Sequence, residues 1–102
     1  KVGSAKAGPD HIDPRYHEAA SGAPCPNLDP WAMRRETLAA IAGGLARLDI
    51  ALVEGVMGLF DGAAEPGLQG RGSTADLAQA LGLPVVLVVN AAGLGHSIAA
   101  LV

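Results

Sequence analysis

The sequence predicts an α/β fold, in which helices cover both faces of a parallel β-sheet. Two continuous apolar runs, Ile50–Val53 and Val85–Val89, have the composition of strands that are buried on both faces. Other stretches repeat apolar residues at helical spacing. The predicted order is strand, helix, strand, helix, strand, helix, and this alternation is typical of parallel sheets joined by right-handed crossovers.

The first strand is predicted at Val2–Lys6. From Ala7 to Pro26 we expect an irregular polar loop, because four prolines interrupt regular structure. A helix is predicted to begin at Asp29-Pro30, since an aspartate can accept hydrogen bonds from unpaired backbone N–H groups and proline suits the first helical position. Apolar residues at helical spacing extend this helix to about Leu48.

The second strand ends at a glycine-rich stretch. Ser73 is predicted to cap the helix that follows, with Asp76 in the capping-box position. That helix is expected to close at Gly82, because glycine tolerates the left-handed backbone that often ends a helix. Val85–Val89 is then the third strand, and a further helix begins at Ser97.

Composition excludes several classes of function. The seven basic residues are scattered and the net charge is −3, so no basic stripe is present to bind nucleic acid. No apolar run approaches the ~20 residues needed to span a membrane. The single cysteine, Cys25, cannot form an internal disulfide, which favours a reducing, cytoplasmic compartment. Because Lys1 is not a start methionine, we expect the chain to be part of a longer protein.

Polar side chains follow each predicted strand, at the edge where open parallel sheets bind ligands. In chain order they are Lys6, Asp10, His11 and Asp13, then Glu54 and Asp61, then Asn90, His96 and Ser97. Glu54 directly follows a buried strand, where a cation would compensate its charge. Mg²⁺ is commonly held by one or two carboxylates and substrate phosphates. Ordinary polar loops would explain the same pattern equally well, because fold alone does not determine function.

Familiar phosphate-binding motifs are absent from the chain. It contains neither a GxxxxGK[ST] phosphate loop nor a GxGxxG fingerprint. Gly70–Thr74 precedes a predicted helix N-terminus, where free N–H groups can hold an anion, but alone it indicates an ordinary loop and cap. Cys25 has no adjacent base, which favours a structural thiol over a nucleophile. His11 and His17 lack a matching ligand cluster, so we expect surface or hydrogen-bonding roles for them.

Two longer stretches are more specific. The first is GPDHIDPRYH at residues 8–17, continuing to NLDPW at 27–31; the second is EGVMGLFDG at 54–62, followed by GSTADLA at 72–78. In sequence, order and spacing, both resemble signatures of the cobyrinic acid a,c-diamide synthase family. His11 stands where tyrosine is common in that family. The Lys6-Ala7-Gly8 lead-in is similar to the hydrogenobyrinic acid branch.

The resemblance implies both a fold and a reaction. Residues 1–102 would form part of an N-terminal ATP-binding domain with the P-loop NTPase fold, similar to dethiobiotin synthetase. The phosphate loop would lie upstream and a glutamine amidotransferase domain downstream, so we expect the chain alone to be inactive. The family's ligases use ATP to phosphorylate the a and c carboxylates of cobyrinic or hydrogenobyrinic acid. Ammonia from glutamine then displaces phosphate to form the amides.

The resemblance also assigns roles to individual residues. Asp10 and Glu54 would hold Mg²⁺ beside the ATP phosphates, and Lys6 would neutralise phosphate charge. Asp13 and Asp61 would orient the substrate or its intermediate. The implied substrate-binding residues are His11, Ile12, Ser73 and Thr74.

The implied partners are a corrinoid tetrapyrrole and glutamine-derived ammonia, and a homodimer is left open. One alternative is a sibling amidase, either nickel-sirohydrochlorin a,c-diamide synthase or cobyric acid synthase. The two motifs favour the a,c-diamide branch over cobyric acid synthase but separate the nickel-tetrapyrrole enzyme poorly. Another is a non-amidating ATPase of the ParA or MinD kind, which a signature lysine in the phosphate loop would identify.

Overall fold

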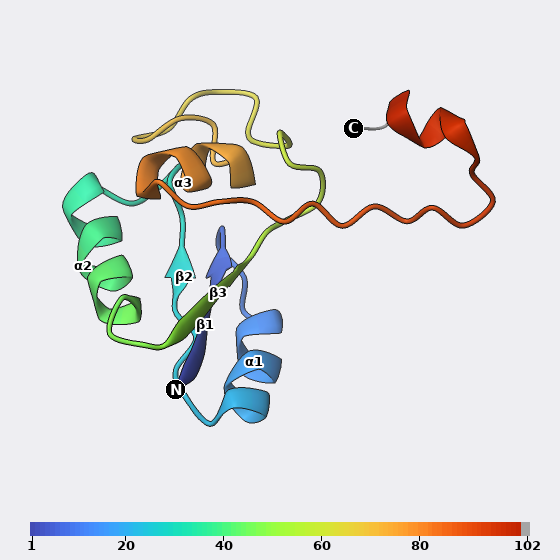
Figure 1. Cartoon of the computed structure of the whole chain (residues 1–102). Coiled ribbons are helices and arrows are strands. Elements are labelled where there is room, and N and C mark those ends of the chain that lie inside the picture. The colour runs from blue at the N-terminus through green and yellow to red at the C-terminus, as the bar shows by residue number, and fades with distance from the viewer. Residues whose placement is uncertain (101–102) are drawn as a thin grey trace.

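A three-stranded parallel sheet with helices forms the body of the molecule, and the computed structural model describes residues 1–100 (Figure 1). The strands are β1 Val2–Ala7, β2 Asn27–Leu28 and β3 Ile50–Glu54, in the spatial order β2-β1-β3. The helices are α1 Asp13–Ser21, α2 Arg35–Leu45, α3 Thr74–Leu81 and the 3₁₀ helix η1 His96–Ala100. The predicted α/β class with a parallel sheet is confirmed.

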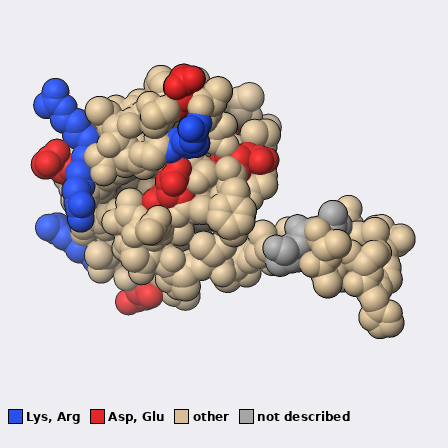
Figure 2. Space-filling model, turned by 90° about the horizontal axis from the view of Figure 1, so that it is seen from above, with Lys and Arg blue, Asp and Glu red and all other residues tan. Residues whose placement is uncertain are grey.

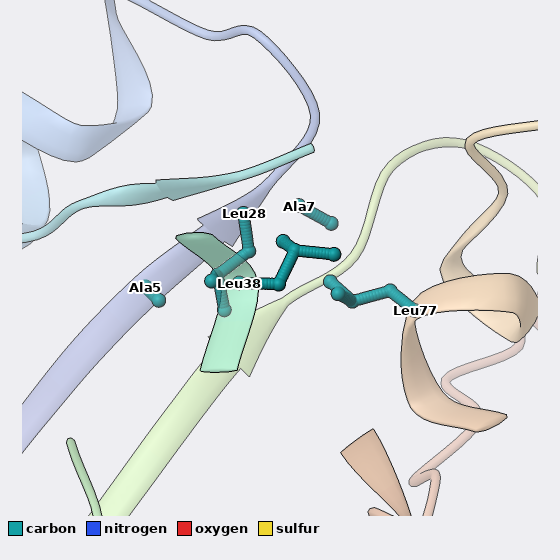
Figure 3. Packing of buried hydrophobic residues seen from close by; sticks show 5 residues of the cluster. All are labelled: Ala5, Ala7, Leu28, Leu38 and Leu77. Atoms are coloured by element: carbon teal, nitrogen blue, oxygen red, sulfur yellow. The ribbon is translucent and has the colours of Figure 1, made fainter. Parts of the chain in front are cut away.

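β1 presents alternate side chains to the two faces of the sheet. On one face, small side chains of β1 pack against residues of β2, α2 and α3, as Figure 3 shows. This buried cluster consists of Ala5, Ala7, Leu28, Leu38 and Leu77. Gly3 lies on the same face, and a Cβ there would stand 2.4 Å from Cδ1 of Leu48. Glycine therefore allows the chain after α2 to approach the sheet closely.

The other face of β1 carries Ser4 and Lys6, and α1 covers it. The prediction of an irregular loop from Ala7 to Pro26 is wrong, because α1 occupies part of it. Pro14 lies in the first turn of α1, where a helix needs no N–H donor. Gly22 ends the helix with a left-handed backbone, φ 67°. Pro14 lies in the first turn and the other three prolines of this segment lie outside the helix, so no proline interrupts it.

α2 begins later than the sequence indicates. Oδ1 of Asp29 accepts hydrogen bonds from the backbone N–H groups of Trp31 at 2.9 Å and Ala32 at 3.3 Å. These bonds cap a separate turn, after which the chain straightens at Arg34 and the helix starts at Arg35. The prediction of capping by Asp29 is therefore right in chemistry but wrong in the element that is capped.

The start and end of α3 are confirmed. Oγ of Ser73 accepts from the N–H of Asp76 at 3.0 Å, and Oδ2 of Asp76 accepts from the N–H of Ser73 at 3.2 Å. Gly82 closes the helix with φ 65°. The reciprocal bonds satisfy backbone donors that a helix leaves free in its first turn.

The third predicted strand is wrong. Val85–Val89 is extended but pairs with no strand among the described residues, and Val86 and Val88 are each 88% exposed. It runs away from the body as an arm that ends in η1, where a helix from Ser97 was predicted (Figure 1). Valines favour a strand only where a neighbour supplies hydrogen bonds and packing.

β3 is formed as predicted, but it is not covered on both faces. Ile50 and Leu52 are 55% and 62% exposed. β3 pairs with β1 alone, so its other edge is unpaired within the described part of the chain. None of the described helices is long and apolar enough to cross a membrane.

Candidate functional site: a lysine among carboxylates at the strand ends

The register of β1 and β3 brings the predicted site together. Lys6 pairs with Glu54 across the two parallel strands, so both side chains leave the sheet on the same face. Nζ of Lys6 lies 3.3 Å from Oε2 of Glu54 and donates to the carbonyl oxygen of Gly55 at 3.0 Å. Both strands end here, at the edge where ligands of parallel sheets bind.

Two aspartates complete the surroundings of the lysine. Asp13, the first residue of α1, places Oδ2 at 3.2 Å from Nζ of Lys6, and Oδ2 of Asp10 lies at 3.9 Å. Oδ1 of Asp10 accepts from the N–H groups of Ile12 at 2.8 Å and Asp13 at 3.1 Å. The Asp10 carboxylate therefore both shapes the entry to α1 and faces the lysine.

Asn27 of β2 holds the segment from the side. Its Nδ2 donates to the carbonyl oxygen of Asp10 at 2.9 Å, and its Oδ1 accepts from the N–H of Asp10 at 3.3 Å. This pair of bonds fixes the backbone of Asp10 against the sheet. Asn27 is the first residue of the NLDPW motif, and its role becomes visible only in the structure.

Charge distinguishes this cluster from an ordinary ion pair. Burial acts to lower the pKa of Lys6, but hydrogen bonds to Asp13 and Glu54 outweigh it and the pKa is raised. The hydrogen bond from His17, followed by that from Lys6, lowers the pKa of Glu54 against partial burial. The backbone N–H of Ile12 is the main cause of the lowered pKa of Asp10. One ammonium group thus faces three carboxylates, which leaves an excess of negative charge.

His17 is the residue that sequence reasoning missed. It lies one helical turn after Asp13 on α1, and its Nε2 is 2.5 Å from Oε2 of Glu54. The expected hydrogen-bonding role thus acquires a partner at the site. The spacing of Asp13 and His17 places them on one helix face, but the spacing carries this signal only when the segment is known to be a helix.

The remaining predicted residues lie outside this cluster. Oδ2 of Asp61 accepts from the N–H of Gly58 at 2.8 Å and stabilises its own turn. Ser73 is a buried helix cap, while Oγ1 of Thr74 accepts from the N–H of Val56 at 3.0 Å. The Thr74 bond ties α3 to the segment that follows Glu54.

His11 and Ile12 are exposed between the two aspartates. The structure therefore unites four of the predicted residues, Lys6, Asp10, Asp13 and Glu54, and places these two on the rim. Figure 2 shows charged groups of both signs on the body and none on the part of the arm that is described.

The predicted Mg²⁺ would need oxygen ligands, which the carboxylates of the cluster can supply. No group of three or more His, Cys, Asp or Glu side chains within residues 1–100 is arranged to hold a metal ion. A site completed by phosphates needs only one or two protein carboxylates. Oε1 of Glu54 has no hydrogen-bond partner among the described residues, and the cluster has excess negative charge. These features fit a cation, and Asp10 and Glu54 as its ligands stay a prediction.

A hollow of about 570 Å³ lies beside the cluster. Its walls are β3, the start of α3 and the segment 83–88, and its lining is mainly apolar. Glu54 is part of that lining, whereas Lys6, Asp10 and Asp13 are not. Of the four clustered residues, Glu54 therefore borders this hollow, while the other three lie away from it at the sheet's carboxyl edge.

The curated proteins that are similar to this chain have the same name in three different bacteria. Hydrogenobyrinate a,c-diamide synthase of Brucella anthropi is 60% identical over 101 residues, which cover 95% of this chain and 22% of that protein. The enzyme of that name from Rhizobium meliloti is 57% identical over 102 residues, with 99% and 23% covered. That from Rhodobacter capsulatus is 53% identical over 95 residues, with 93% and 22% covered.

The matches cover nearly all of this chain but only a small part of each relative. The chain spans less than a quarter of the length of these relatives. No family model and no solved structure matches it, so the P-loop NTPase assignment stays a prediction. The resemblance read from the two motifs is nevertheless confirmed: along nearly its whole length, this chain is similar to one segment of the hydrogenobyrinate a,c-diamide synthases.

Proposed function

We propose that this chain provides the phosphoryl-transfer edge of an enzyme that amidates the a and c carboxylates of hydrogenobyrinic or cobyrinic acid. The reaction would use ATP, Mg²⁺ and ammonia from glutamine. A carboxylate oxygen of the substrate attacks the γ-phosphorus and ADP leaves; ammonia then attacks the acyl carbon, loses a proton and expels phosphate. The relatives' names favour the hydrogenobyrinate substrate over the sibling tetrapyrroles.

The observation that carries the proposal is the Lys6 cluster. A cation is held at the carboxyl ends of two neighbouring parallel strands, within 3.9 Å of three carboxylates. Phosphoryl transfer depends mostly on positioning and on stabilising charge that spreads over the phosphoryl oxygens. A cation whose place is already fixed needs no reorganisation when that charge develops. Lys6 meets this requirement, because the strand register and its partners hold its ammonium group in place.

The three carboxylates of the cluster would have different roles in metal binding and in substrate orientation. Glu54 and Asp10 would hold Mg²⁺, which compensates the repulsion between these carboxylates and the ATP phosphates when it is bound. Asp13 is half-exposed, so it can also reach outward to orient a substrate carboxylate or the incoming ammonia. His11 and Ile12 are exposed beside it and are suited to contact the tetrapyrrole.

Asp61, Ser73 and Thr74 support the loops around this edge. Asp61 closes the turn after β3, where it is exposed and able to orient the intermediate. Ser73 and Thr74 stand at the start of α3, where the positive end of the helix dipole favours an anion such as a carboxylate or phosphate. Their substrate-binding roles follow from the family resemblance.

The test is Glu54→Gln in a complete synthase that carries this sequence. The substitution preserves shape and removes the charge, so ATP-dependent diamide formation should fall by about 100-fold or more. Glutamine hydrolysis should persist. Glu36→Gln is the matched control, because Glu36 is exposed on α2 and lies outside both motifs. Diamide formation is followed across a range of Mg²⁺ concentrations, and turnover near that of the control would contradict the proposal.

A further inference from the structure

The contact between His17 and Glu54 joins α1 to β3. Oε2 of Glu54 receives two partners, Nε2 of His17 at 2.5 Å and Nζ of Lys6 at 3.3 Å. Both partners bind the same oxygen, and Oε1 of Glu54 is engaged by no described residue. The orientation of Oε1 is therefore set by the two donors that hold Oε2.

The lysine alone would hold this carboxylate loosely. The Glu54 side chain is 46% exposed, and a glutamate has several rotatable bonds to restrict. Lys6 is shared with Asp13 and Asp10, so its ammonium does not select one orientation of Glu54. His17 contacts Glu54 from α1, a different element from the strand that carries Lys6.

α1 contributes to the cluster twice. Asp13 and His17 are separated by one helical turn, which places both on the face of α1 that lies toward the sheet. Asp13 contacts Lys6 of β1, and His17 contacts Glu54 of β3. A single helix thus fixes both members of the Lys6–Glu54 pair.

We propose that His17 is a positioning residue for phosphoryl transfer. Its Nε2–H donates to Oε2 of Glu54 and restricts the rotation of that carboxylate, which keeps Oε1 available for a cation beside the phosphates. This inference rests on the proposed function, and it adds a residue that acts through Glu54 without touching the reacting atoms. Groups that orient a charged ligand in this way commonly change activity by about 10- to 100-fold.

The contact itself is tested in the 102-residue chain without any assay of activity. Nitrogen-15 NMR of the imidazole ring distinguishes a protonated Nε2 from an unprotonated one. We expect Nε2 of His17 to carry the proton in the wild type, and Glu54→Ala to shift the ring nitrogen signals. Unchanged His17 signals in Glu54→Ala would show that the contact does not exist and would overturn the proposal.

The role is tested by kinetics in a complete synthase that carries this sequence. His17→Ala should lower kcat for amidation by about 10- to 100-fold and leave the KM for ATP within about threefold. His17→Gln should restore most of the rate, because the glutamine amide can place an N–H near the position of Nε2. Tyr16→Ala is the matched control, since Tyr16 is an exposed neighbour on α1. Equal thermal midpoints for the variants exclude simple unfolding.

The outcomes separate this inference from the function on which it rests. If the wild-type synthase amidates and His17→Ala equals Tyr16→Ala, the positioning role is wrong and the proposed function stands. If His17→Gln is no better than His17→Ala, the rate loss is structural and the positioning role is also wrong. If the wild type makes no amide, the proposed function fails and the role of His17 falls with it.

Discussion

Replacing Lys6 with methionine should destabilise the chain more than any exposed charge change. The substitution roughly preserves length but removes the ammonium that lies 3.2, 3.3 and 3.9 Å from three carboxylate oxygens. Losing one partner of a buried ion pair costs about 3–5 kcal/mol. The three carboxylates are 25–46% exposed and so partly screened by water. The expected loss is therefore about 2–3 kcal/mol, between the buried and surface limits.

The pH dependence of this loss follows from the direction of the pKa shifts. Glu54 and Asp10 have lowered pKa values in the folded chain, so their stabilisation is present above the ordinary values of 4.5 and 3.8. It is lost as the pH falls through the lower folded values. Lys6 has a raised pKa, so its contribution is present below 10.5 and lost as the pH rises through the higher folded value. The difference between wild type and Lys6→Met should be constant near neutral pH and shrink in acid.

The assay is urea unfolding of the 102-residue chain followed by circular dichroism. Arg47→Met is the control, because Arg47 is exposed and has no ion pair among the described residues. An osmolyte series with trimethylamine N-oxide brings a marginal variant into the measurable range. A Lys6→Met loss within about 0.5 kcal/mol of the control, the ordinary range for surface changes, would refute the reasoning. So would a loss that persists undiminished in acid.

Two further predictions concern Asp13 and Ser73. In a complete synthase, Asp13→Asn should alter the accumulation of monoamide intermediates more than the KM for ATP, because Asp13 is half-exposed at the outer side of the cluster and the substrate is rich in carboxylates. Chromatography of the products over time checks this, and an unchanged monoamide profile would argue against a substrate-facing role. Ser73→Ala should cost about 1 kcal/mol of folding stability, because the hydroxyl accepts from the N–H of Asp76. Urea unfolding measures the loss with Ser97→Ala as the control, and equal stability of the two variants would contradict the capping role.

Features set by neighbouring residues could be predicted from the sequence. The Ser73–Asp76 capping box and the left-handed Gly82 involve hydrogen bonds and backbone angles within one helical turn. β1 and β3 follow from their local composition. The family resemblance already indicated the four predicted residues that meet at the site, Lys6, Asp10, Asp13 and Glu54. The α1 helix was also within reach of local reasoning, because Pro14 lies where prolines begin helices.

Only the tertiary structure decided how distant residues meet. The register that sets Lys6 opposite Glu54, and the bond from His17 to Glu54 across 37 positions, depend on how α1 packs on the sheet. The exposed β3 and the unpaired Val85–Val89 show the same dependence, since an apolar run becomes a covered strand only beside a partner. Composition by itself determined which segments could be buried and which side chains could carry charge. Packing determined which of those charges share one site, because strand register and helix placement are properties of the assembled sheet.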